Sequence, residues 1–421
     1  MKKKLDFSGL RTFFQGPWKW LYPGIGIKRW IFVAALGLMF IVTGSSRFRS
    51  EEYWIIQILD LLVAVSGVII LILGIERMMR SFIAAFVPAT KDSELVDLLL
   101  VRKQLSRGPK IVAVGGGTGL SVLLTGLKEF TSNITAIVTV ADDGGSSGRL
   151  RQQFDVLPPG DIRNCLVALA DAPALMRDLF QFRFDKSSEL SGHSFGNLFI
   201  TAMCRLTGDF EKAIKETSKV LALRGQVIPS TLENVVLEAQ HKDGSITTGE
   251  TQIPQVRKPI SKIYMKPPGS PATPEALRAI EEAQIIVLGP GSLYTSIIPN
   301  LLIKEITDAI AASGAIKVYV CNVMTQPGET DSFTASSHIK TLIAHSHPRI
   351  IDYCIVNAGE IPVSILKRYA EDGSYPVVND RRNIENMGYR VIEEDFALAE
   401  ELIRHNARKL AQIILGFIEE I

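Results

Sequence analysis

The stretch Lys110–Gly148, KIVAVGGGTGLSVLLTGLKEFTSNITAIVTVADDGGSSG, decides the fold of this 421-residue chain. It predicts a short apolar strand over 111–114, a glycine-rich turn, an amphipathic helix, a second strand over 135–140 and an acidic, glycine-rich turn. This order is typical of the first β-α-β unit of a doubly wound nucleotide-binding domain. We therefore predict an α/β fold for residues 110–421, with a mostly parallel, Rossmann-like sheet and a small antiparallel insertion.

Composition sets the first limits on function. Hydrophobic residues make up 47% of the chain and charged residues 21%, and the mean hydropathy is +0.19. A chain of this composition is more apolar than is usual for a soluble enzyme, which suggests a membrane segment. The formal net charge of +2 gives no electrostatic reason to expect nucleic acid as a partner. The four cysteines are far apart and lack metal-ligand spacing, so we expect reduced thiols and no zinc site.

Two apolar runs in residues 1–87 predict a membrane hairpin with transmembrane helices at about 28–46 and 53–75. The second run is long enough for a hydrocarbon layer that takes roughly 20 helical residues to cross, and aromatic residues flank the first run. Lysine and arginine are concentrated before the first run and after the second. We therefore expect a multi-pass protein of the cell (inner) membrane, with both termini and the main domain in the cytoplasm.

Two alternatives to the membrane hairpin are a signal peptide and a buried helical hairpin. A signal peptide fits poorly, because no small-residue cleavage site follows the first run. Asp60, near one end of the second run, either reaches toward the membrane interface or pairs with a neighbouring helix. Residues 88–109 are predicted to be a linker that contains a charged helix over 93–105.

The glycine-rich turn at 115–119 is typical of a phosphate site, because glycines let backbone N–H groups approach an anion at a helix N-terminus. It does not match the dinucleotide spacing, which would place glycine at Leu120, and it lacks the lysine of a P-loop. We therefore expect no NAD. The acidic turn that follows the second strand has a pair of carboxylates, Asp142 and Asp143. They suit ribose hydroxyls or Mg²⁺ beside a diphosphate, and a solvated turn is the alternative.

Later segments add candidates to the same crevice. Asp161 is a predicted N-cap of a helix over 162–170, and Asn197 opens another helix, whereas His193 is more often structural than catalytic at such a position. A hairpin is predicted around Asp243-Gly244, followed by a basic flap over 255–273, and a C-terminal helix over 396–418. The turns near 115, 142, 289 and 322 all follow predicted strands, so one shared site is expected. The candidate nucleotide-binding residues are Gly116, Gly117, Thr118, Gly119, Asp142, Asp143, Gly144, Ser146, Asp161, Asn164, Asn197, Gly289, Gly291, Ser292, Asn300 and Asn322.

Six motifs in this order resemble the YvcK/CofD-like family over residues 109–421: GGGTGLSVLLTGLK (115–128), TVADDGGSSGRLR (139–151), LPPGDIRNCLVALA (157–170), GHSFGNLFI (192–200), LGPGSLYTSIIPNLL (288–302) and CNVMTQPGET (321–330). The resemblance implies that the turns at 116–119 and 142–143 line a nucleotide site, and that the 289–292 turn, Asn300 and Asn322 contact base or sugar-diphosphate. It does not extend to the predicted membrane hairpin.

The resemblance implies two functions. The YvcK branch, called the gluconeogenesis factor, is similar in fold, binds UDP-sugars such as UDP-N-acetylglucosamine, supports cell shape and cell-wall synthesis under gluconeogenic growth, and has links to a Ser/Thr kinase. The CofD branch implies a Mg²⁺-dependent 2-phospho-L-lactate transferase acting on a nucleotide-diphosphate donor. The LPPGDIRN motif favours the YvcK branch, because the transferases have a more acidic loop there. We therefore expect a membrane-tethered UDP-sugar-binding regulator, with transferase activity as the alternative and homo-oligomerisation left open.

Overall fold

The computed structural model describes residues 27–48, 53–86, 100–185, 189–399 and 403–419. The chain divides into two compact units, Met1–Val101 and Arg102–Ile421. Both hydrophobic core clusters consist of residues from Ile111 onward, so the larger unit has a complete core of its own. The predicted linker helix over 93–105 lies partly outside the described residues.

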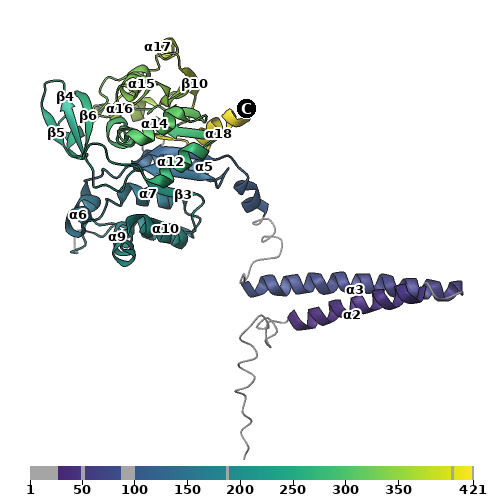
Figure 1. Ribbon diagram of the computed structural model, residues 1–421. Coiled ribbons are helices and arrows are strands. Elements are labelled where there is room, and N and C mark those ends of the chain that lie inside the picture. Colours follow the sequence, from purple (N-terminus) through teal and green to yellow (C-terminus); the bar gives the residue numbers. More distant parts are fainter. Residues whose placement is uncertain (1–26, 49–52, 87–99, 186–188, 400–402, 420–421) are drawn as a thin grey trace, which may run out of the picture. The chain divides into compact units, whose positions relative to one another are not determined.

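The smaller unit contains two long helices, α2 (Ile27–Phe48) and α3 (Trp54–Phe86), which lie side by side and antiparallel (Figure 1). Glycines allow the close approach: a Cβ added to Gly37 would lie 2.6 Å from the backbone nitrogen of Leu71, and one added to Gly67 would lie 2.7 Å from the Gly37 carbonyl oxygen. Helix α3 extends well past its predicted end at residue 75. The two helices are long and apolar enough to cross a membrane.

The surface of this helical hairpin is apolar, whereas its one buried acid faces inward. Phe32, Leu62 and Ile72 are 58–70% exposed on the outside of the pair. Asp60 is only 7% exposed, and its backbone oxygen lies close to Gly44 of α2. Asp60 therefore packs against the neighbouring helix, which was one of its two predicted placements.

The larger unit is built on a seven-stranded sheet in the order β10-β9-β8-β7-β1-β2-β3, in which all neighbouring strands are parallel. The strands are β1 (Ile111–Gly115), β2 (Ile134–Val138), β3 (Gln226–Pro229), β7 (Ile285–Leu288), β8 (Ile316–Val320), β9 (Tyr353–Asn357) and β10 (Arg390–Glu394). The chain builds outward from β1 to β3 and then returns to place β7 on the other side of β1. Such a reversal opens a crevice at the carboxyl ends of the strands. The predicted doubly wound α/β fold is confirmed.

Helices cover both faces of this sheet because its strands are apolar on both sides. In β1, Ile111 and Ala113 belong to one core cluster and Val112 and Val114 to the other, and all four are buried. The first cluster also contains side chains of α5 (Gly117–Leu127), α7 (Gly160–Leu169), α8 (Ala174–Gln181), α9 (Phe195–Thr207), α10 (Phe210–Val220) and α18 (Ala407–Glu419). The second contains side chains of α12 (Pro274–Glu282), η2 (Leu293–Ile297), α13 (Ile298–Leu301), α14 (Lys304–Ala312), η3 (Pro348–Ile350), α15 (Ala335–Ala344) and α17 (Arg381–Asn386).

The antiparallel insertion forms a separate sheet in the order β5-β4-β6. Its strands are β4 (Val236–His241), β5 (Ile246–Thr248) and β6 (Ile260–Lys266). The hairpin predicted around Asp243-Gly244 is confirmed, since it joins β4 to β5. The flap predicted over 255–273 is wrong at its centre, because β6 pairs along β4 and buries Ile260 and Ile263. Helix α6 (Gly145–Phe154) follows β2 of the main sheet, and α11 (Gln252–Gln255) lies between β5 and β6 of the insertion.

The C-terminal helix predicted over 396–418 is wrong in its first part. The chain there forms two short antiparallel strands, β11 (Ala397–Ala399) and β12 (Ile403–His405), and α18 begins only at Ala407. The backbone N–H groups of Phe396 and Ala397 both donate to Asn357 Oδ1 at 3.0 Å. This bonding ties the segment to the end of β9, and α16 (Val363–Glu371) follows the same strand end.

Close packing of α5 against the start of α18 makes a prediction about stability. A Cβ on Gly126 would lie 2.0 Å from the Ala407 carbonyl oxygen, so Gly126→Ala should lower the free energy of unfolding of residues 102–421 by about 1–3 kcal/mol. Gly416→Ala on α18 meets open space and should raise it by about 0.5–1 kcal/mol through helix propensity. Urea unfolding measures both, and equal effects of the two changes would contradict the packing.

Candidate functional site

The first glycine-rich turn joins β1 to α5. Its neighbours leave no room for a side chain at Gly116 or Gly119. Gly117 begins α5 with φ +65°, a left-handed conformation that favours glycine. A Cβ on Gly116 would lie 2.5 Å from Asp161 Oδ2, and a Cβ on Gly119 would lie 2.6 Å from the Pro290 carbonyl oxygen. The turn therefore contacts both the start of α7 and the turn after β7.

The second glycine-rich turn follows β7, the neighbour of β1 at the point where strand order reverses. A Cβ on Gly291 would approach the Gly116 carbonyl oxygen to 3.4 Å, so the two turns meet backbone to backbone. Ser292 Oγ donates to the carboxylate of Glu329 and accepts from Thr295 Oγ1 at 2.7 Å. Burial raises the pKa of Glu329, and the bond from Ser292 partly offsets that shift.

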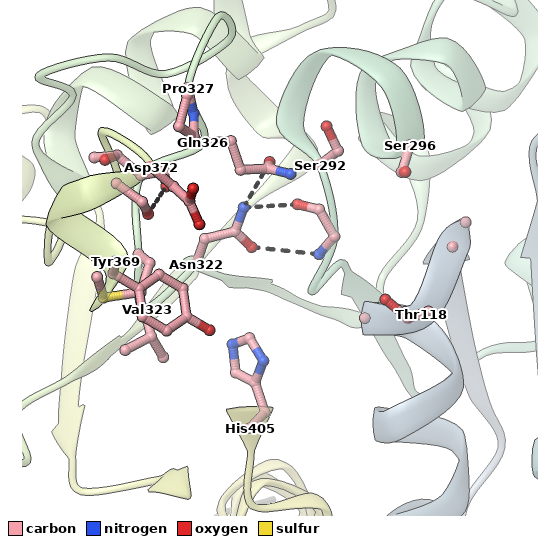
Figure 2. A pocket seen from close by; sticks show the side chains of 17 residues that line it. Thr118, Ser292, Ser296, Asn322, Val323, Gln326, Pro327, Tyr369, Asp372 and His405 are labelled. Carbon is pink, nitrogen blue, oxygen red and sulfur yellow. Dashed lines mark hydrogen bonds between the residues drawn. The ribbon is translucent and has the colours of Figure 1, made fainter. Parts of the chain in front are cut away.

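Two asparagines fasten these turns to each other and to the sheet. Asn322, after β8, donates through Nδ2 to the Gly291 carbonyl oxygen at 2.9 Å, and its Oδ1 faces the Gly291 N–H at 3.4 Å (Figure 2). Asn300 is fully buried and donates through Nδ2 to the carbonyl oxygens of Gly115 at 3.0 Å and Ser296 at 2.8 Å. Asn300 therefore supports the first turn from behind, whereas Asn322 lines the opening.

Together these elements enclose a pocket of about 480 Å³, which we call the glycine-turn pocket. Seven predicted residues line it: Gly116, Gly117, Thr118, Gly119, Gly291, Ser292 and Asn322. Residues 323–327 line its far side, and Tyr369, Asp372, Ser374 and His405 complete it (Figure 2). Of the four turns that the sequence predicts to share one site, those after β1, β7 and β8 line this pocket, and the turn at 142, after β2, does not.

Other predicted residues lie around this pocket in supporting positions. Asp143 Oδ1 accepts from the backbone N–H of Thr251 at 2.9 Å and from its hydroxyl at 2.7 Å. Ser146 Oγ is 2.9 Å from His193 Nδ1, and Asn197 Oδ1 accepts from Arg163 at 3.1 Å. Gly144 donates its N–H to Asp142 Oδ1, and Gly289 has φ +79° beside Ile297. Asn164 lines a second cleft described below.

Acidic side chains converge on the side of the first turn that faces α7. Asp161 is not an N-cap, because helix α7 begins at Gly160, and the Asp161 carboxylate accepts the backbone N–H of Gly117. Burial, and then the charge of Asp142, raise the pKa of Asp161 to about 7. Burial also raises the pKa of Glu250 well above its usual range, with added repulsion from Asp161 and Asp142.

The two carboxylates of the predicted Mg²⁺ site differ in their surroundings. The two Thr251 hydrogen bonds engage one oxygen of Asp143, and Gly249 packs against the other, so Asp142 and Asp143 do not form a free chelating pair. The Asp142 carboxylate instead lies next to Gly160, and the Asp161 carboxylate lies next to Gly116. The two carboxylates are close enough for the charge of Asp142 to raise the pKa of Asp161. Within the ranges that the structure describes, no group of three or more His, Cys, Asp and Glu side chains is placed to hold a metal ion.

Sequence reasoning missed residues that reach the site from distant segments. His405, on β12, lines the glycine-turn pocket, and its Nε2 is buried with no hydrogen-bond partner among the described residues. Burial lowers the pKa of His405 to about 4, partly offset by a hydrogen bond to the Cys321 backbone, so the ring is neutral near pH 7. Its position inside a predicted helix hid this role, and no motif marks Glu250 or Tyr369.

The sequence of this chain is similar to those of known proteins. The family model described as 2-phospho-L-lactate transferase CofD matches residues 111–397. A Nostoc sp. (strain PCC 7120) protein named putative gluconeogenesis factor is 46% identical over 418 residues, covering 94% of this chain and 91% of that protein. The gluconeogenesis factor of Bacillus subtilis (strain 168) is 47% identical over 317 residues, covering 75% of this chain and 100% of that protein.

A solved structure agrees with the fold. The crystal structure of a UPF0052 family member from Bacillus halodurans is 48% identical, with a TM-score of 0.72, and covers 73% of this chain and 99% of that one. The Bacillus proteins therefore correspond to about three quarters of this chain, whereas the match to the Nostoc protein is long enough to extend into the N-terminal helical hairpin.

The raised pKa of Asp161 predicts a pH dependence of stability. The folded pKa of about 7 lies above the ordinary 3.8, so the folded protein binds this proton more tightly, and the free energy of unfolding should fall as pH rises from 4 to 7. Asp161→Asn keeps an acceptor for Gly117 and should make this slope shallower, by up to about 1.4 kcal/mol per pH unit. Urea unfolding of residues 102–421 at several pH values measures it, with exposed Asp155→Asn as the control. An unchanged slope in Asp161→Asn would contradict the assignment.

Proposed function

This chain belongs to the CofD family and is of the gluconeogenesis-factor (YvcK) type, and from that premise we propose that it binds a nucleotide-sugar of the UDP-N-acetylglucosamine kind in the glycine-turn pocket. In this proposal the protein is a membrane-tethered regulator of cell shape, cell-wall synthesis and carbon metabolism under gluconeogenic growth. The observation that carries it is the backbone contact between the turns at 115–119 and 289–292.

The chemistry of that contact suits a diphosphate. Thr118 and Gly119 lie in the first turn of α5, where their backbone N–H groups have no intrahelical partners and the helix dipole favours an anion, whereas the Gly117 N–H is donated to Asp161. Gly291 and Ser292 bring a second set of backbone groups to the same pocket. Because no side chain at Gly117, Gly119 or Gly291 covers the backbone, a phosphate can approach these groups closely.

The far side of the pocket suits the polar, uncharged parts of the ligand. Its volume of about 480 Å³ is in the range of small-molecule sites. The neutral His405 is held by its bond to the Cys321 backbone, which leaves Nε2 as an acceptor for a sugar hydroxyl or an amide N–H. Asn322 Nδ2 donates to Gln326 Oε1 at 3.4 Å as well as to the second turn. In this proposal, Asn322 therefore links the turn to the part of the pocket that holds the base or the sugar.

In this proposal, Mg²⁺ enters with the diphosphate, and Asp142 is its protein ligand. One observation favours the transferase alternative, namely that Asp161 has a pKa of about 7 and could take a proton from an acceptor hydroxyl near pH 7. A Ser/Thr kinase and a second copy of the chain are further proposed partners, for which the YvcK-like motifs are the only support.

Ligand binding tests the proposal directly. UDP-N-acetylglucosamine at 100 times its Kd should stabilise residues 102–421 by about 2.7 kcal/mol, which is measurable by thermal shift and calorimetry. Gly119→Ala should abolish binding, because the new Cβ would force Pro290 and the second turn away. Gly314→Ala, which meets nothing within 4 Å, is the control and should bind normally.

Two outcomes of the same experiment contradict the proposal. Absence of binding by the unaltered protein rules out this ligand class. Binding of guanosine diphosphate in place of UDP-sugars, with turnover of a guanylyl-activated donor when Mg²⁺ is added, would favour the transferase alternative.

The N-terminal helices support a membrane location, because apolar side chains such as Phe32 and Leu62 have no partner within the hairpin and are exposed. The full chain should therefore remain with the membrane fraction after an alkaline carbonate wash, and residues 102–421 alone should be soluble. Recovery of the full chain in the soluble fraction would contradict the tether.

A further inference from the structure

A second cavity, which we call the basic cleft, adjoins the glycine-turn pocket at the N-terminus of α5. Its volume is about 860 Å³. Thr118, Gly119, Tyr369 and His405 line both cavities, so the two adjoin along the first turn of α5 and one histidine. The proposed nucleotide site, on which this inference rests, therefore has a neighbouring compartment.

The charges that line the basic cleft are strongly unbalanced. Lys128, Arg163, Arg177 and Arg183 contribute four cations, whereas Asp178 is the acid in its lining and is exposed. Arg177 has no hydrogen bond or carboxylate partner for its guanidinium among the described residues. Lys128 is half-buried, and burial lowers its pKa, with further lowering by the charges of Arg177 and Arg224. Lys128 also donates to the Ala170 carbonyl oxygen at 2.9 Å, and the charges of Asp171 and Glu129 act against the lowering of its pKa.

The floor of the basic cleft presents hydrogen-bond donors that lack acceptors. Arg163 is only 6% exposed; it donates to Ser194 and, at 2.7 Å, to Asn164 Oδ1, while its Nε has no partner in the described part of the chain. Because that bond uses the amide oxygen of Asn164, the Asn164 NH₂ group remains available as a donor in the cleft. An anion bound in the cleft could accept a hydrogen bond from this NH₂ group.

We propose that the basic cleft binds a second small molecule, a phosphorylated metabolite, beside the nucleotide site. Arg177 and Arg183 at the rim attract its phosphate group, Lys128 adds a third charge, and Asn164 donates from the floor. The volume of about 860 Å³ is in the range of small-molecule sites, so the cleft suits a small ligand. Guanidinium groups suit phosphate because they can donate two parallel hydrogen bonds to its oxygens.

Calorimetry with inorganic pyrophosphate tests this proposal on residues 102–421 saturated with UDP-N-acetylglucosamine. The unaltered protein should bind one pyrophosphate. The double variant Arg177→Gln/Arg183→Gln should bind it at least tenfold more weakly and keep its affinity for the nucleotide-sugar within about twofold. The control Lys340→Gln/Arg382→Gln removes two exposed cations on other helices and should bind pyrophosphate normally.

Three results would overturn the proposal: no pyrophosphate binding, equal binding by both double variants, or displacement of pyrophosphate by the nucleotide-sugar, which would make the cleft part of one site. If the nucleotide-sugar itself does not bind, the same titration without it still reports on Arg177 and Arg183. The experiment therefore distinguishes failure of the proposed function from failure of the proposal that the basic cleft binds a phosphorylated molecule. Circular dichroism of the variants confirms that each is folded.

Discussion

The backbone contact between the two glycine turns is the constraint on which the rest of the site depends. Strands β1 and β7 are parallel neighbours, so the turns at their carboxyl ends emerge side by side. They meet because Gly119 has no side chain against Pro290 and Gly291 has none against Gly116. Asn300 fixes the end of β1 from behind, and Asn322 ties the second turn to β8. These contacts tie the two turns to each other and to the sheet.

The first turn of α5 also separates two electrostatic environments. On one side, Asp161 and Glu250 are carboxyl groups whose pKa values are raised by burial. On the other lies the basic cleft, with Arg177 at its rim. Arg163 lies between them: burial, and then the charge of Arg183, lower its pKa to about 10, while Asp161 and Asp142 act in the opposite direction. A phosphate bound at this turn, as proposed, would lie close to groups of both kinds.

Much of this architecture could be predicted from residues 110–148 and from the later glycine turns, because glycine after an apolar strand is a local signal. The start of α18 could not, since the apolar spacing over 396–405 also fits a helix, and Asn357, far away in sequence, binds the backbone instead. For the same reason the role of His405 was hidden. Asp143 is predicted to lie beside the ligand, and Thr251, between β5 and α11, donates two hydrogen bonds to it, a contact that no local pattern reveals.

The most direct measurement is a crystal structure of residues 102–421 with UDP-N-acetylglucosamine. We predict that the diphosphate lies between the backbone N–H groups of 118–119 and of 291–292, with His405 Nε2 within hydrogen-bond distance of the sugar or base. A diphosphate bound elsewhere, or one that binds only after the two turns have separated, would contradict it.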